Sequence, residues 1–181
     1  MEELSATAYV ILGFVRKEPR SGYEIKALVD NSTRFFWAAS YGQIYPELKR
    51  LAEAGLIVGS DSPTGERRRT VYEITADGEE ELRAWLRQPP QTFETRDEGL
   101  LKLFFSGALP REEALEILRA MRAQRLAANA RLRAIGEMKG EMETFPRIVL
   151  EGGLEFTEWF ANWCERMEAE ILASAPKERS S

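Results

Sequence analysis

Side chains that can contact nucleic acid lie on one face of a helix predicted between Ser40 and Gly55. Apolar residues recur there at helical spacing and predict a buried face, which comprises Ile44, Leu48, Leu51 and Ala52. Polar and basic residues fall on the opposite face, including Gln43, Lys49 and Arg50. A glutamine amide can pair with adenine, and lysine and arginine can neutralise phosphates. One buried face and one polar, cationic face suit a helix that enters a DNA groove, although an ordinary amphipathic helix shows the same periodicity.

The ends and the middle of this predicted helix carry specific signals. Ser40 is a suitable N-cap because its hydroxyl can accept an N–H of the first turn, and Gly55 can adopt the left-handed conformation that closes a helix. Pro46 should kink the helix, since it cannot bond to the carbonyl of Gly42. Tyr41 can touch a thymine methyl or a phosphate. The residues that we expect to contact DNA in this segment are Ser40, Tyr41, Gln43, Tyr45, Lys49 and Arg50.

A second positively charged element follows this helix. Residues with β propensity run from 56 to 58 and from 70 to 74, and the turn-forming cluster Asp61–Gly65 lies between them. The second run is preceded by three consecutive arginines, Arg67, Arg68 and Arg69. Together these features predict a β-hairpin whose positive tip contacts phosphates. A solvated loop, in which Asp61 and Glu66 balance the arginines, is the alternative interpretation.

Composition limits the classes of function. The 181 residues are 44% hydrophobic and 30% charged with a net charge of −5, which is typical of a soluble globular protein and argues against one that coats DNA indiscriminately. The sequence has no histidine and a single cysteine, Cys164. Zinc sites of the Cys/His type, a Ser-His-Asp triad and imidazole catalysis are therefore excluded. A glycine-rich phosphate loop and a nucleophile motif are also absent, so we expect neither an enzyme nor a cofactor or metal.

Features that govern localisation predict a cytoplasmic protein. No apolar run approaches the roughly 18 residues that span a membrane, and the acidic start Met1–Leu4 lacks the basic region of a signal peptide. The lone cysteine rules out a disulfide within the chain.

The segments around the cationic helix complete a winged helix-turn-helix. Helices are expected at 4–15 and from Ser21, where Glu24 completes a capping box. A fourth helix at 76–87 follows the hairpin, capped by Thr75, with Leu82, Trp85 and Leu86 as its core residues. Three helices, a hairpin and a fourth helix are the order of elements in a winged helix-turn-helix. We assign it to residues 1–90 of a chain that is mostly α-helical with a small β-hairpin.

Several short motifs are specific enough to suggest a family. They are Ser21–Ile25, Tyr41–Leu48, Gly55–Ile57, Tyr72–Thr75 and Leu100–Phe105. On these residues the sequence resembles the PadR family of transcriptional regulators along nearly its whole length. The resemblance implies that the third helix continues through Pro46 and that a larger, all-helical C-terminal domain is present. It also implies a ligand-responsive repressor that binds double-stranded DNA; a winged-helix protein-interaction module without DNA binding is the alternative.

Residues 91–181 are predicted to form this helical dimerisation and effector domain, after a linker at 91–96. Helices are expected at about 97–105, from Pro110 until a break at Phe145-Pro146, and from about Ile148, with an interruption or a fresh start at Gly152-Gly153. The middle helix carries an approximate heptad seam that needs a partner helix: Leu118, Met121, Ala128, Leu132, Ile135 and Met142. We therefore expect a homodimer, which by symmetry binds an inverted-repeat operator.

Aromatic residues of the C-terminal half are candidates for binding a small aromatic effector, which the family resemblance implies. They are Phe93, Phe104, Phe105, Trp159 and Trp163. The alternative interpretation is that these side chains form the core of the dimer.

Overall fold

The computed structural model describes residues 4–64, 67–91 and 96–174, with side chains left out at 62–64 and 67–68. The chain divides into two compact units, Met1–Thr92 and Phe93–Ser181. In the described residues, no helix is long and apolar enough to cross a membrane.

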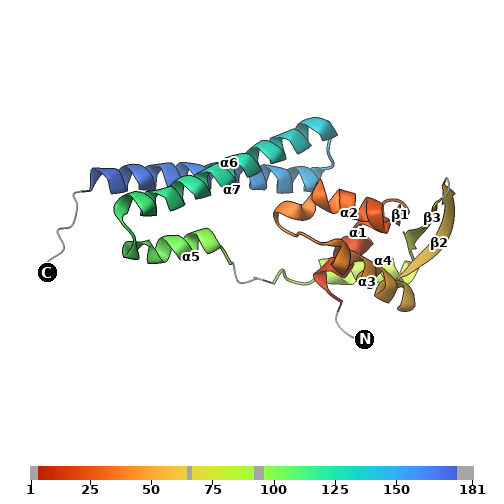
Figure 1. The fold of residues 1–181 in the computed structure, drawn as a ribbon. Helices are drawn as coiled ribbons and strands as arrows, with labels where there is room; N and C mark the ends of the chain where they lie inside the picture. The colour runs from red at the N-terminus through yellow and green to blue at the C-terminus, as the bar shows by residue number, and fades with distance from the viewer. Residues whose placement is uncertain (1–3, 65–66, 92–95, 175–181) are drawn as a thin grey trace. The chain divides into compact units, whose positions relative to one another are not determined.

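Among its described residues, the N-terminal unit has four α-helices and a three-stranded antiparallel sheet (Figure 1). The helices are α1 (Ala6–Val15), α2 (Gly22–Asp30), α3 (Tyr41–Glu53) and α4 (Ala76–Leu86), and a short 3-10 helix, η1, spans Thr33–Phe35. The strands β1 (Arg20–Ser21), β2 (Ile57–Thr64) and β3 (Arg67–Ile74) pair in the order β1-β3-β2. This is the predicted winged helix-turn-helix.

Strand β2 extends beyond its predicted end, through the residues expected to form a turn. Asp61 pairs with Thr70, and Pro63 pairs with Arg68. Proline is tolerated there because β2 lies at the edge of the sheet, where one side of the strand needs no N–H donor. The result is a longer hairpin than the sequence predicted.

The core of this unit is built mainly from α1, α2 and α3, and Leu56, Ile57 and Leu82 complete it. Ile44, Leu48 and Leu51 are fully buried, as the periodicity of α3 predicts. Ala52 is exposed, contrary to the prediction, because it lies at the border of the buried face. On α4 only Leu82 is buried among the three predicted core residues, since Trp85 is 39% and Leu86 is 65% exposed. One side of the Trp85 ring stacks on Tyr9 of α1, with centroids 4.4 Å apart.

Local signals define the helix ends. At α2, the N–H of Ser21 donates to Oε2 of Glu24 at 2.8 Å and the N–H of Glu24 donates back to the Ser21 hydroxyl at 3.4 Å, which confirms the capping box. Gly55 has a φ of +73°, and the N–H of Leu56 bonds to the carbonyl of Leu51 at 2.9 Å, as in a glycine-terminated helix. Helix α3 continues without interruption through Pro46, as the family resemblance implied.

The C-terminal unit is a pair of long helices with a shorter one beside them. Helix α5 (Glu98–Phe105) and the 3-10 helix η2 (Ser106–Ala108) precede α6 (Arg111–Lys139) and α7 (Thr144–Ala173), which lie side by side (Figure 1). The predicted break at Phe145-Pro146 is wrong. The chain turns at Gly140, whose φ is +58°, and Pro146 lies in the first turn of α7, where its missing N–H has no helical partner to lose. Helix α7 also runs uninterrupted through Gly152-Gly153.

Helix α7 covers the predicted seam of α6. Leu118 and Met121 are buried in a cluster with Phe160 and Cys164 of α7. Next to it, buried Asn129 donates to Oγ1 of Thr157 at 2.8 Å and to the carbonyl of Leu154 at 3.0 Å. The partner helix that the seam requires is therefore present in the same chain. The large apolar side chains that stay exposed in this unit lie at other positions, among them Leu101, Phe104, Phe105, Phe145, Phe156 and Trp159.

Candidate DNA-binding surface

Helix α3 presents a pair of tyrosines on its exposed side. Tyr41 is 44% and Tyr45 51% exposed, and their rings lie one helical turn apart with centroids separated by 6.1 Å. From α2, the ammonium group of Lys26 lies 5.6 Å from the centre of the Tyr41 ring, within the range of a cation–π contact. Lys26 also forms an ion pair with Asp30. These contacts hold two large amphipathic rings, each with a polar hydroxyl, on the exposed side of α3.

The N-terminus of α3 is closed by a capping box that includes a predicted base-reading residue. The N–H of Ser40 donates to Oε1 of Gln43 at 2.9 Å, and the hydroxyl of Ser40 lies 3.1 Å from the same oxygen. Both residues are exposed. The Gln43 amide oxygen therefore serves the helix end, a role that the sequence analysis did not assign. The spacing of serine and glutamine at positions i and i+3 is the signal that could have revealed it.

The two cations of α3 differ in their environment. The Lys49 side chain is 79% exposed and lies 3.7 Å from Glu53, one turn away, in a weak surface contact. Arg50 is bound to Oε1 of Glu47 at 3.1 Å. That carboxylate is only 12% exposed and also accepts a hydrogen bond from the Ser5 hydroxyl at 2.9 Å. Lys49 is thus the more available cation, whereas Arg50 is held by the largely buried carboxylate of Glu47.

The β2–β3 hairpin, which is the wing of this fold, places Arg69 beside α2 and not at its tip. Arg69 lies opposite Ser62 in the hairpin, and its guanidinium is 3.4 Å from Oε1 of Glu24. The Ser21 N–H and hydroxyl, together with the charge of Arg69, hold the pKa of Glu24 below its ordinary value despite partial burial. Arg67 and Arg68 begin strand β3, but their side chains lie outside the described residues. Of the three predicted arginines, Arg69 is therefore the one whose side chain the structure describes.

Two residues of α2 complete this surface and were not found from the sequence. Gly22, the first residue of α2, lies against the ring of Tyr45, and Lys26 lies over Tyr41. Both contacts join residues about 15 to 23 positions apart, so no local pattern indicates them.

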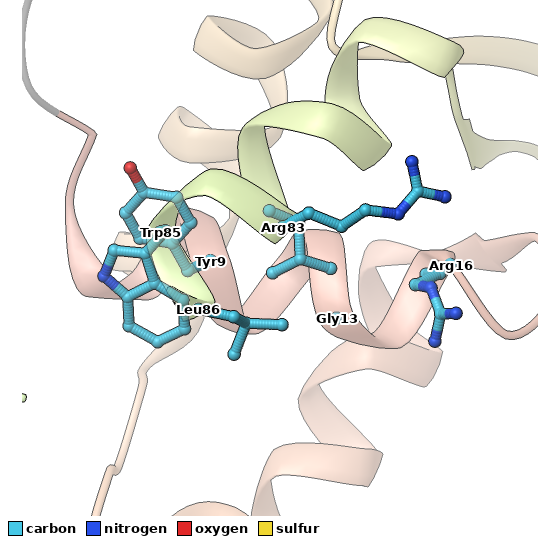
Figure 2. A pocket seen from close by; sticks show the side chains of 7 residues that line it. Tyr9, Gly13, Arg16, Arg83, Trp85 and Leu86 are labelled. Atoms are coloured by element: carbon cyan, nitrogen blue, oxygen red, sulfur yellow. The ribbon is translucent and has the colours of Figure 1, made fainter. Parts of the chain in front are cut away.

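A shallow hollow of about 360 Å³ lies between α1 and α4 in the same unit (Figure 2). The stacked rings of Tyr9 and Trp85 form one end, and Arg16 and Arg83 lie at the other. Leu82 and Leu86 contribute apolar surface, and Gly13 leaves the α1 side open because no atom lies within 4 Å of where its Cβ would be. This hollow was not predicted from the sequence.

The predicted effector residues occupy different environments in the C-terminal unit. On α5, Phe104 and Phe105 are 82% and 65% exposed, whereas their neighbour Leu103 packs against the α6–α7 cluster. On α7, Trp159 is 55% exposed and Trp163 is partly buried against that cluster. Phe93 lies outside the described residues. Among these residues only Trp163 therefore contributes to the described core.

The part of the chain that the structure describes has the elements of a DNA-binding protein and shows no grouping suited to metal chemistry. Among the described residues, no three Cys, Asp or Glu side chains lie together as metal ligands. Figure 1 shows the helices, the protruding β-hairpin and the third helix of a winged helix-turn-helix. With exposed tyrosine, glutamine and lysine on α3, this fold defines the class of winged helix-turn-helix DNA-binding proteins.

Comparisons with known proteins identify the family. Residues 11–84 match the transcriptional regulator PadR-like family, and residues 95–171 match the family described as virulence activator alpha C-term. The chain is 32% identical to the negative transcriptional regulator PadR of Bacillus subtilis over 174 residues, which cover 90% of this chain and 96% of that protein. The chain therefore belongs to the PadR-like family of transcriptional regulators. It is a transcriptional regulator and not an enzyme, as the sequence predicted.

Solved structures of similar proteins share the fold along almost the entire chain. Bacillus subtilis PadR in complex with operator DNA has a TM-score of 0.83 at 31% identity, covering 92% of this chain and 99% of that chain. The same protein in complex with p-coumaric acid has a TM-score of 0.76 at 29% identity, covering 95% and 100%. The match spans both units, which agrees with the predicted fold class.

Proposed function

We propose that this protein is a repressor that binds an inverted-repeat operator as a homodimer and releases it when an aromatic effector binds. The observation that carries the proposal is the exposed side of α3, where Tyr41, Tyr45, Gln43 and Lys49 are presented together. The operator complex of the Bacillus subtilis relative supports DNA binding by this fold. In this proposal Ser40, Arg50 and the arginines at 67–69 contribute further contacts, chiefly to phosphates.

In this proposal the two predicted segments of the chain have different functions. Residues 1–90 would bind DNA, and residues 91–181 would dimerise and respond to the effector. Support for dimerisation comes from the exposed aromatic side chains of α5 and α7, because such a set of apolar side chains on a water-soluble regulator marks an interaction surface. A regulator of transcription with one buried cysteine, Cys164, fits the cytoplasm, where thiols stay reduced.

The effector would be a small aromatic carboxylic acid. The complex of the Bacillus subtilis relative with p-coumaric acid supports this class of ligand. Two regions of this chain offer aromatic contacts: Phe93, Phe104, Phe105, Trp159 and Trp163 in the C-terminal half, and the hollow beside Tyr9 and Trp85. The volume of the hollow lies at the lower end of the range expected for a ligand pocket. Arg16 suits a ligand carboxylate, whereas Arg83 already forms ion pairs with Glu79 and Glu80.

The alternative function, a protein-interaction module without DNA binding, is favoured by one observation. Lys49, Arg50 and Arg69 each have a carboxylate within 3.7 Å, so the positive charge of the surface is partly compensated. The alternative predicts weak, sequence-independent attraction to DNA at low salt and none at physiological salt.

Selection of bound sequences from a random duplex pool tests the proposal against this alternative. A DNA-binding homodimer should enrich an inverted repeat whose half-site centres are about 10 base pairs, or a multiple, apart. Recovery of an unenriched pool at physiological salt would refute the proposal and leave the protein-interaction module.

A further inference from the structure

The capping box of α3 determines which atoms of Gln43 are available to a base. The Ser40 N–H is a donor only, so the Gln43 atom 2.9 Å from it must be the amide oxygen. The Ser40 hydroxyl lies 3.1 Å from the same oxygen and can donate to it as well. Two donors match the two lone pairs of an amide oxygen, so this oxygen has no acceptor capacity left for a base.

In the major groove the bases present different hydrogen-bond donors and acceptors to such a side chain. Adenine presents an acceptor and a donor, N7 and N6–H, and its bidentate pairing uses both the oxygen and the nitrogen of a glutamine amide. Guanine presents two acceptors, N7 and O6, while cytosine presents a donor. With its oxygen committed to Ser40, Gln43 offers only the two N–H bonds of its NH₂ group.

We propose that Gln43, held in the capping box, reads guanine as a hydrogen-bond donor and does not read adenine by bidentate pairing. The proposal rests on the proposed function, because it assigns a base to a helix that must first enter the major groove. It replaces the adenine contact expected from the sequence. The capping box and the readout are compatible because they use different atoms of the same amide group.

The discriminating variant is Gln43→Glu. Glutamate is a standard third residue of the capping box, so the variant keeps the cap. Its side chain accepts hydrogen bonds and cannot donate them, so it should lose guanine and prefer cytosine, whose N4–H₂ is a donor. Gln43→Ala removes both the cap and the readout. Ser40→Ala keeps the backbone N–H but removes the second donor, so one lone pair of the Gln43 amide oxygen becomes available to a base.

The experiment measures affinity for four duplexes that differ only at the operator position whose preference depends on residue 43. Wild type should favour guanine over adenine by roughly 5- to 150-fold, the range of one good base contact. Ser40→Ala should narrow the preference for guanine over adenine, Gln43→Glu should shift the preference to cytosine with lower affinity for all duplexes, and Gln43→Ala should abolish it. Thermal unfolding should show Gln43→Glu to be at least as stable as Gln43→Ala.

Three results would overturn the inference. A wild-type preference for adenine that Gln43→Ala abolishes would mean that the cap opens and the amide pairs with both atoms. An operator whose base preferences are unchanged in Gln43→Ala and Gln43→Glu would mean that Gln43 reads no base, while DNA binding stands. Failure of wild type to bind any duplex would refute the proposed function together with the inference.

Discussion

The ring of Tyr45 on α3 lies against Gly22, the first residue of α2. A Cβ at Gly22 would be 2.9 Å from Cε1 of Tyr45, closer than real Cβ contacts, and within 3.0 Å of Cζ of Tyr45 and 3.1 Å of Cδ1 of Leu48. The missing side chain at Gly22 therefore allows the Tyr45 ring to lie on α2. Because Tyr41 stacks on Tyr45, the position of both rings depends on this glycine.

Gly22→Ala should weaken DNA binding more than it weakens folding. The added methyl group would push the Tyr45 ring away from α2, and overpacking of this kind costs about 1–3 kcal/mol when the neighbour cannot move. Tyr45 is half exposed and can move, so we expect about 1 kcal/mol or less in the free energy of unfolding. The displaced tyrosines should lower operator affinity by about tenfold, equivalent to ~1.4 kcal/mol. Calorimetric unfolding and fluorescence anisotropy with operator DNA measure the two effects.

Two controls isolate the role of Tyr45. Gly13→Ala adds a methyl group to a helical glycine with nothing within 4 Å, and it should stabilise the protein by about 0.5–1 kcal/mol without affecting DNA binding. In a Tyr45→Ala background, Gly22→Ala should have no further effect on affinity. An equal loss of affinity in both backgrounds would show that Gly22 does not act through Tyr45.

Local signals in the sequence predicted most of this unit, and contacts between distant segments account for what was missed. The buried face of α3 and the Ser21–Glu24 box follow from spacings of three and four residues, which the helix itself enforces. The contact of Arg69 with Glu24 joins residues 45 positions apart and depends on how the hairpin lies beside α2. The role of Gln43 could not be predicted for a different reason, because a glutamine at this position fits both a capping box and a contact with a base.

The C-terminal unit shows the same division between local pattern and packing. Leu118 and Met121 follow the predicted seam, but the seam packs against α7 of the same chain. The position of the turn was missed because Phe145-Pro146 is a strong helix breaker in the middle of a helix and an acceptable first turn at its start. Nothing in the periodicity distinguishes those two positions, whereas Gly140 with its positive φ ends α6.

Replacing the three wing arginines by alanine should reduce the salt dependence of DNA binding. Each lost phosphate contact changes the slope of log K against log salt by about 0.9, so the triple variant Arg67→Ala, Arg68→Ala, Arg69→Ala should flatten it by up to about three. Arg69→Ala alone should change it less, because Arg69 already has Glu24 as a partner at 3.4 Å. Affinities measured from low to physiological salt give the slopes.

A triple substitution of Arg131, Arg147 and Arg166 by alanine controls for the change in net charge. Equal affinity of the wing variant and wild type at low salt would contradict the role of the wing.

Acidification should remove the contribution of Glu24 to folding. The pKa of Glu24 is lowered chiefly by the hydrogen bond from the Ser21 N–H, then by the Ser21 hydroxyl, with Arg69 adding a smaller effect. A lowered pKa means that the folded state binds the proton less readily than the unfolded state. The stabilisation is therefore complete above the ordinary value of 4.5 and is lost as the pH falls through the lower, folded-state pKa.

Glu24→Gln is the matched control for this pH dependence. Its amide oxygen can accept the same bond from Ser21 but does not titrate. The stability difference between wild type and this variant, from urea unfolding between pH 7 and pH 3, should favour wild type near neutrality and shrink below pH 4.5. A difference that stays constant over this range would show that the Glu24 charge does not stabilise the fold.

Removal of the C-terminal unit should leave a folded monomer that binds DNA poorly. The N-terminal unit has its own core of fully buried residues, including Ile11, Leu12 and Leu48. A fragment ending at Pro90 should therefore unfold cooperatively. Without its partner it loses the gain from binding two half-sites at once, so its operator affinity should fall by at least a hundredfold. Light scattering measures the mass, and a dimeric fragment would place the interface in the winged helix.

An aromatic carboxylic acid should quench tryptophan fluorescence and lower DNA affinity in the same concentration range. To act as an inducer, the ligand must bind more tightly to the conformation that does not bind DNA. A difference of about 3 kcal/mol between its binding free energies for the two conformations lowers DNA affinity over a hundredfold. p-Coumaric acid is a suitable first probe, because a relative of this chain binds it.

Tryptophan variants locate this effector site. Loss of quenching in Trp85→Phe would place it at the hollow between α1 and α4, where the ring stacks on Tyr9. Loss of quenching in Trp159→Phe or Trp163→Phe would place it on α7. Trp37→Phe is the matched control, because Trp37 belongs to neither region. If p-coumaric acid quenches one of these tryptophans and leaves operator affinity unchanged, binding is not coupled to DNA release, and the switch is wrong for that ligand.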